Sequence, residues 1–117
     1  ATTAMSGVEH MGISGRSCHD CDYSRTVDER EMADLASQIN SDWVIHDSHH
    51  LRREWSFPDF ASALIFVNQA GDVCEAENHH ADFELGWGRV CATIWTHSLD
   101  GLTEADFVLA AKMDALE

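Results

Sequence analysis

The chain has 117 residues, of which 44% are hydrophobic, and its 21 acidic and 7 basic side chains give a formal charge of −14. This length suits one compact domain with a modest core. The strong negative charge repels phosphate backbones and anionic lipids, so we expect neither nucleic acid nor a membrane as a direct partner. The longest apolar run, at residues 61–67, is far too short to cross a bilayer.

Residues 1–25 are rich in Gly, Ser, Thr and His and show no apolar period, which predicts a flexible or loosely docked N-terminal tail ahead of a domain at 26–117. The tail holds a C-x-x-C at Cys18 and Cys21, a spacing that can bind zinc or form a redox pair. The zinc ligand set is incomplete, so we expect inert thiols. Residues 1–17 lack the basic start and apolar stretch of a secretion signal, which favours a reduced, cytoplasmic setting.

The first half of the predicted domain contains one helix and two strands. The helix should begin at Thr26, where T-V-D-E fits a capping box closed by Glu29, and should end at Asn40. Residues 43–46 and 51–57 read as two short strands joined by the turn D-S-H-H. Odd-numbered residues of the second strand should share one face, because strand side chains alternate.

A second helix should run from Pro58 to about Ala76. Apolar side chains occur on two of its faces, which predicts burial on two sides. In so small a domain one of those sides should face another subunit. We therefore expect a homodimer or homotetramer.

The remaining chain predicts two strands and a final helix. Residues 83–87 alternate as a strand does, Gly88 marks a turn, and residues 90–97 form a β-rich run. The last helix should begin at Thr103, where T-E-A-D again resembles a capping box. The order is α-β-β-α-β-β-α, which predicts an α+β fold: a four-stranded antiparallel sheet with three helices packed on one face.

The densest polar cluster is E-A-E-N-H-H-A at residues 75–81, between the second helix and the next strand. Hairpin topology would bring its histidines, His79 and His80, close to His97 at the end of the following strand. Three imidazoles around one pocket suit proton transfer at neutral pH. Taken alone, an adjacent histidine pair after a helix is more often simply a polar loop. A zinc site is disfavoured, because neighbouring strand residues point to opposite faces.

The segment from Glu75 to Asp106 resembles the signature of the pterin-4a-carbinolamine dehydratase family. The family pattern is an acidic residue, His-His, usually Pro, an aromatic residue, a later His and then an Asp. Those positions read Glu75, His79, His80, Ala81, Trp87, His97 and Asp106. The flanking motifs R-x-W-S-F-P-D-F-A-S-A and T-H-S-L-D-G-L-T-E-A-D are similar as well, so the resemblance covers residues 26–116. Ala81 is the one departure.

The resemblance implies a lyase that dehydrates 4a-hydroxytetrahydropterin (4a-hydroxytetrahydrobiopterin) to quinonoid dihydropterin, recycling the pterin used by aromatic amino-acid hydroxylases. Such a reaction needs no metal and no organic cofactor. The resemblance assigns acid–base catalysis to three residues and substrate binding to three more. The catalytic residues are His79, His80 and His97, and the substrate-binding residues are Glu75, Trp87 and Asp106.

Several of these residues have simpler explanations. Trp87 alternates with Phe83 and Leu85, as core packing alone would require. Asp106 lies three residues after Thr103, where a helix cap needs an acidic residue, and capping is the role we favour. Some relatives of the family act as non-catalytic dimerisation cofactors of transcription factors or as assembly chaperones. The retention of all three histidines favours the enzyme.

Overall fold

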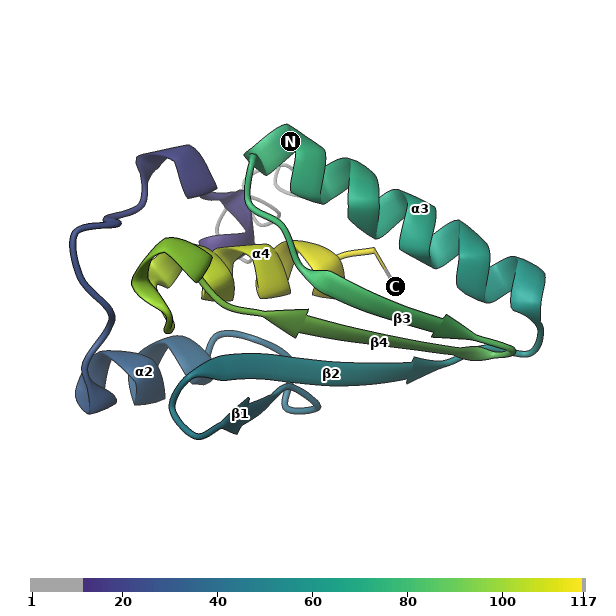
Figure 1. Cartoon of the computed structure of the whole chain (residues 1–117), viewed down its shortest axis with the longest axis horizontal. Helices are drawn as coiled ribbons and strands as arrows, with labels where there is room; N and C mark the ends of the chain where they lie inside the picture. Colours follow the sequence, from purple (N-terminus) through teal and green to yellow (C-terminus); the bar gives the residue numbers. More distant parts are fainter. Residues whose placement is uncertain (1–11, 117) are drawn as a thin grey trace, which may run out of the picture.

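A computed structural model describes residues 12–116 and confirms the α+β class and the predicted order of elements. Four strands form one antiparallel sheet in the order β1-β2-β4-β3. In Figure 1, α3 and α4 cover one face of this sheet. The strands are β1 Val44–His46, β2 His50–Ser56, β3 Asp82–Gly86 and β4 Arg89–Ile94, and the helices are α2 Glu29–Ala36, α3 Phe60–Glu77 and α4 Glu104–Asp114.

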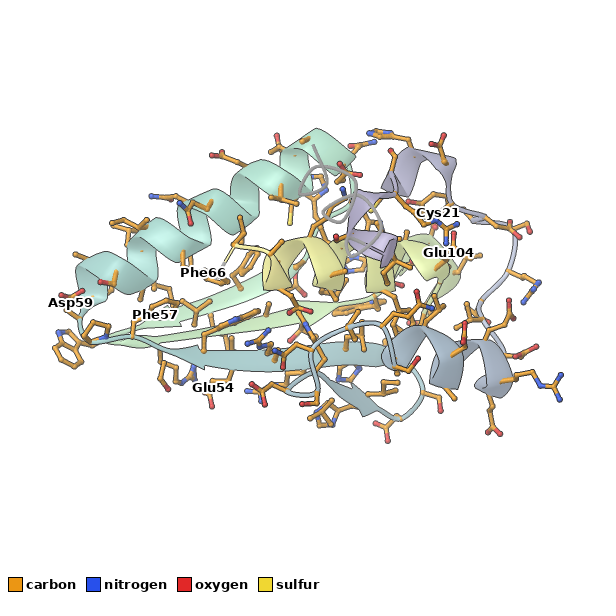
Figure 2. All side chains as sticks on the ribbon, turned by 180° about the vertical axis from the view of Figure 1, so that it is seen from behind. Cys21, Glu54, Phe57, Asp59, Phe66 and Glu104 are labelled. Atoms are coloured by element: carbon orange, nitrogen blue, oxygen red, sulfur yellow. The ribbon has the colours of Figure 1, made fainter. Side chains whose placement is uncertain are left out.

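The core lies between the sheet and the helices α3 and α4. The predicted alternation of β2 is confirmed, because Leu51, Arg53 and Trp55 are buried on the helix side. The Arg53 guanidinium is held there by the Asp114 carboxylate at 2.5 Å. Figure 2 shows Phe57 and Phe66 between α3 and the sheet, and their ring centroids are 5.4 Å apart. Burial of these apolar groups supplies the main drive for folding.

The predicted start of the first helix is wrong by three residues. The N-cap of α2 is Asp28, whose carboxylate accepts the Glu31 N–H while the Glu31 side chain returns to the Asp28 N–H. Thr26 cannot begin the helix, because the Val27 N–H bonds the Leu102 carbonyl at 2.9 Å and holds this part of the chain extended.

Other boundaries move less. α3 begins at Phe60 after an Asp59 cap rather than at Pro58. α4 follows Thr103 as predicted, and the Thr103 N–H donates to the Asp106 carboxylate. β4 ends at Ile94, before the predicted residue 97. No helix formed by residues 12–116 combines the length and the apolar character that crossing a membrane requires.

The described part of residues 1–25 packs against the domain instead of forming a flexible tail. Two 3-10 helices, Gly12–Gly15 and Cys18–Asp20, pack against α4, and the side chains of Ile13, Cys18 and Cys21 are buried. The sequence does not show how firmly this segment docks, because its apolar residues are too few to show a period and their burial depends on the surface of α4. Residues 1–11 lie outside the described residues.

Burial holds the thiols of this segment in the protonated form. It raises the pKa of both Cys18 and Cys21 to about 12, and the neighbouring carboxylates Glu77 and Glu104 add to the shift. The thiolate is the nucleophile and the metal ligand, so both cysteines should be inert in the folded protein.

We therefore predict that iodoacetamide at pH 8 leaves Cys18 and Cys21 unmodified in the folded protein and modifies both after unfolding in urea. Site-resolved mass spectrometry measures the extent at each thiol. Because an unfolded thiol ionises near pH 9, these two groups should also make the free energy of unfolding fall as the pH rises from about 9 towards 12. Equal modification of Cys18 in folded and unfolded protein would contradict the docked segment.

Candidate functional site

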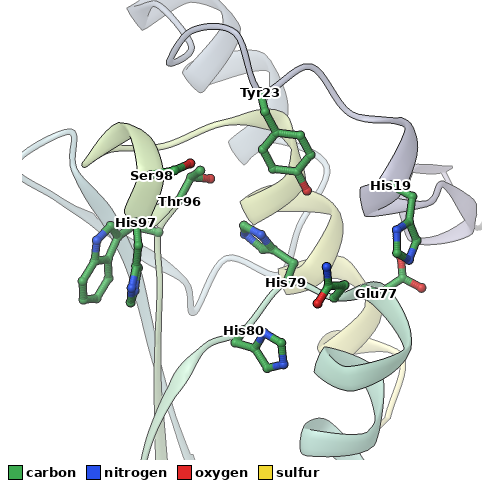
Figure 3. Close-up of a pocket in the computed structure, with 10 residues that line it drawn as sticks. His19, Tyr23, Glu77, His79, His80, Thr96, His97 and Ser98 are labelled. Carbon is green, nitrogen blue, oxygen red and sulfur yellow. The ribbon is translucent and has the colours of Figure 1, made fainter.

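One pocket of about 440 Å³ collects the predicted histidines (Figure 3). Its walls come from three regions: the N-terminal segment, the turn after α3, and the connection between β4 and α4. His79, His80 and His97 all line it, together with Trp95, Tyr23 and His19. A pocket of this size accommodates a bicyclic heterocycle.

The C-terminus of α3 places the histidine pair. Asn78 caps the helix in the left-handed conformation, at φ 52°, which asparagine tolerates better than most residues. The N–H of His79 then turns back to the Cys74 carbonyl at 3.2 Å. This reversal ends the helix at the pocket, and the two imidazoles leave it in different directions (Figure 3).

A buried carboxylate fixes His79. Asp106 is 0% exposed, and its Oδ1 lies 2.6 Å from Nε2 of His79. Its Oδ2 accepts the Thr103 N–H at 2.8 Å and the Thr96 hydroxyl at 2.9 Å. A carboxylate can only accept, so the Nε2 of His79 carries the proton and Nδ1 remains for the pocket. Asp106 therefore caps α4 and orients an imidazole at the same time.

His80 has a different partner. Its Nε2 lies 2.5 Å from Oε2 of Glu75, one turn back along α3, and both side chains are exposed. Glu75 is therefore the hydrogen-bond partner of His80, as Asp106 is of His79. One imidazole–carboxylate pair is buried and the other is in contact with solvent, so water screens them very differently.

His97 lies in the loop between β4 and α4, in the 3-10 helix His97–Leu99. Its ring stacks on Trp95 with centroids 4.2 Å apart and an interplanar angle of 27°. Paired hydrogen bonds between the backbones of Thr96 and Gly101 close this loop. His97 is therefore held by ring stacking and loop closure, with no hydrogen bond from its imidazole to any residue between 12 and 116.

None of the three predicted substrate-binding residues lines this pocket. Glu75 contacts His80 and does not line the pocket. Asp106 is fully buried beneath His79, so it orients this histidine and cannot touch a ligand in the pocket. Trp87 does not line this pocket: it is 75% exposed in the turn between β3 and β4, at the opposite end of these strands (Figure 1).

Three ring side chains that line the pocket were missed by the sequence analysis: Trp95, His19 and Tyr23. Trp95 stands two positions before His97, and this spacing places two residues on the same side of an extended chain, a usable signal. His19 and Tyr23 lie in the N-terminal segment, and no local pattern links them to residues about 60 positions away.

At Ala81, where the family pattern has Pro, the backbone N–H interacts with the Cys74 sulfur; burial raises the pKa of this thiol, and the N–H partly opposes that rise. Proline would lack this donor.

Among residues 12–116, no three His, Cys, Asp or Glu side chains are placed as the ligands of a metal ion would be.

Comparisons with known proteins show the family of this chain. The family model described as pterin 4 alpha carbinolamine dehydratase matches residues 25–116. A Rickettsia bellii protein named "Putative pterin-4-alpha-carbinolamine dehydratase" is 38% identical over 106 residues, 90% of this chain and 94% of its own. A Rubrobacter xylanophilus protein of the same name is 51% identical over 86 residues, 74% of this chain and 79% of its own.

A solved structure shares the fold. The crystal structure titled transcriptional coactivator/pterin dehydratase from Brucella melitensis superposes with a TM-score of 0.73 and 32% sequence identity, covering 79% of this chain and 98% of that one. The family model spans most of the chain and includes the histidine pair, His97 and Asp106. The chain therefore belongs to the pterin-4a-carbinolamine dehydratase family.

Proposed function

We propose that this protein dehydrates 4a-hydroxytetrahydrobiopterin to quinonoid dihydrobiopterin by histidine acid–base catalysis. One observation carries the proposal: three imidazoles line a single pocket. Two of them are bonded to carboxylates, one to the buried Asp106 and one to the exposed Glu75. Family membership supports the reaction class. The tetrahydrobiopterin substrate, and with it a place in cofactor recycling, follows from the resemblance.

The reaction is an elimination of water. A proton is delivered to the hydroxyl at C4a, the C–O bond breaks, and the neighbouring ring nitrogen loses its proton as the C=N bond forms. Water leaves, and neither an oxidant nor a reductant is consumed. An acid and a base on two sides of a flat ring suffice, and imidazoles perform both roles near neutral pH.

The hydrogen bonds of His79 and His80 leave both imidazoles able to take up and return a proton. In each neutral ring Nε2 donates to a carboxylate, so Nδ1 is a bare acceptor able to take a proton. Once Nδ1 is protonated, the neighbouring carboxylate stabilises the imidazolium, which can then return the proton. His97 lies on the Trp95 side of the pocket, and we assign His80 and His97 to the reacting edge of the pterin.

Removal of the His80 and His97 imidazoles tests their assignment to the reacting edge. A His80→Ala/His97→Ala double variant should lower kcat by about 10²- to 10⁴-fold, the usual contribution of positioned acid–base groups. Stopped-flow absorbance with freshly generated 4a-hydroxytetrahydrobiopterin measures the rate. His46→Ala is the matched control, since His46 is exposed and lies outside the pocket, and it should keep the wild-type rate.

A wild-type protein no faster than buffer would end the enzymatic proposal. The competing proposal, a non-catalytic dimerisation or assembly module, would then gain. The printed title of the Brucella neighbour names a coactivator as well as a dehydratase, and such a module would work through an exposed surface.

We also propose that the protein self-associates through α3. This proposal is supported by three exposed apolar side chains on the helix, Phe60, Leu64 and Ile65, the last 57% exposed. Neighbouring exposed apolar residues on one helix are typical of an interface. The buried residues of α3, Ala63, Phe66 and Ala70, pack on the core, and these three exposed side chains are left outside it.

Ile65→Glu should therefore shift the molar mass at micromolar concentration towards that of a monomer, because it would place a charge inside the interface. Light scattering coupled to gel filtration measures the mass. Gln38→Glu adds the same charge at an exposed position just after α2 and should leave the wild-type oligomer intact. A monomeric wild-type protein would contradict self-association.

A further inference from the structure

The segment Ser17–Tyr23, here called the cover segment, forms one wall of the histidine pocket through His19 and Tyr23 (Figure 3). It precedes residues 25–116, the part of the chain that the family model describes. Neither side chain takes part in the proposed acid–base catalysis. Both nonetheless stand beside the catalytic histidines, which raises the question of what they contact.

The cover segment is firmly attached. Cys18 is 0% exposed, its N–H donates to Glu77 Oε1 at 2.8 Å, and its thiol donates to the Ala105 carbonyl at 3.5 Å. These contacts join the segment to the end of α3 and to the first turn of α4, the two elements that carry His79 and Asp106. The wall is therefore part of the same rigid framework as the histidines.

Tyr23 offers its ring to the pocket. The ring centroid is 6.0 Å from that of His79 at an interplanar angle of 50°. The hydroxyl donates to the Cys18 carbonyl at 2.8 Å, and burial raises the pKa of this phenol to about 12, so it stays neutral and is committed to the backbone. Tyr23 is thus poorly placed for acid–base work and well placed for contact with a flat ligand.

His19 offers one ring nitrogen. Its Nε2 lies 3.1 Å from the Ala76 carbonyl, which only accepts, so Nε2 carries the proton. Nδ1 is then the free acceptor of a neutral ring at the rim of the pocket, on the side away from His97 (Figure 3).

We propose that the cover segment is the substrate-recognition element of this site: the Tyr23 ring packs on the pterin ring system across the pocket from Trp95 and His97, and His19 accepts a hydrogen bond from a polar substituent. The inference rests on the proposed dehydratase function. It divides the pocket into a catalytic part, built by the family core, and a binding part, built by the segment before it.

Steady-state stopped-flow kinetics with 4a-hydroxytetrahydrobiopterin, and calorimetric titration with the stable pterin biopterin, test this division. Tyr23→Leu should raise both KM and the Kd for biopterin by about three- to tenfold, with kcat changed by less than about twofold, because ring contacts bind substrate and transition state alike. His19→Ala should raise both by about two- to tenfold through loss of one hydrogen bond.

Two matched variants sharpen the result. Tyr23→Phe keeps the ring and loses only the bond to Cys18, so its KM and Kd should rise less than those of Tyr23→Leu. Asp20→Ala changes an exposed residue of the same segment outside the pocket and should have no effect. Protection of Cys18 from iodoacetamide at pH 8 reports that the segment is still docked in each variant.

Wild-type KM and Kd in both Tyr23→Leu and His19→Ala would overturn the inference and leave the dehydratase proposal standing. A loss in Tyr23→Phe as large as in Tyr23→Leu would also overturn it, since the effect would belong to the hydroxyl and its anchor. If the wild type itself neither bound biopterin nor accelerated dehydration, the proposed function would fail first.

Discussion

The buried carboxylate of Asp106 is the constraint on which the site depends. A charge without solvent is costly unless every lone pair finds a donor. Here the Thr103 N–H, the Thr96 hydroxyl and the His79 imidazole supply those donors. One side chain therefore begins α4, ties the end of β4 to it, and fixes an imidazole that arrives from α3. Loss of any partner would disturb both the fold and the pocket.

The second imidazole of the pair has a different environment from the first. His80 is bonded to Glu75 in contact with solvent, whereas His79 is bonded to a carboxylate that water does not reach. Asn78 makes this difference possible, because its left-handed conformation ends α3 and sends the two neighbouring histidines in different directions. The environments, rather than the residue types, set the two histidines apart.

Much of this arrangement could be predicted from local sequence. Strand alternation identified the buried face of β2, and T-E-A-D identified the start of α4, because both signals act over a few residues. The features that depend on tertiary contacts could not be predicted in this way. Val27 is held extended by Leu102, which moves the start of α2, and the burial of Cys18 depends on contacts with α3 and α4.

The site residues meet the same limit. The alternation of Trp87 with its neighbours identifies a strand pattern and does not say which end of the hairpin meets the pocket. Asp106 was recognised as a helix cap, but its bond to His79, 27 residues earlier, needs the folded chain.

The most direct test of this account is the protonation pattern of His79, read by long-range 15N–1H correlation spectroscopy of the imidazole rings. The account predicts that neutral His79 carries its proton on Nε2, pointing at Asp106, and that Asp106→Ala abolishes this preference. A wild-type His79 protonated on Nδ1 would contradict it, because the carboxylate would then have no imidazole donor and the pocket no bare acceptor on that ring.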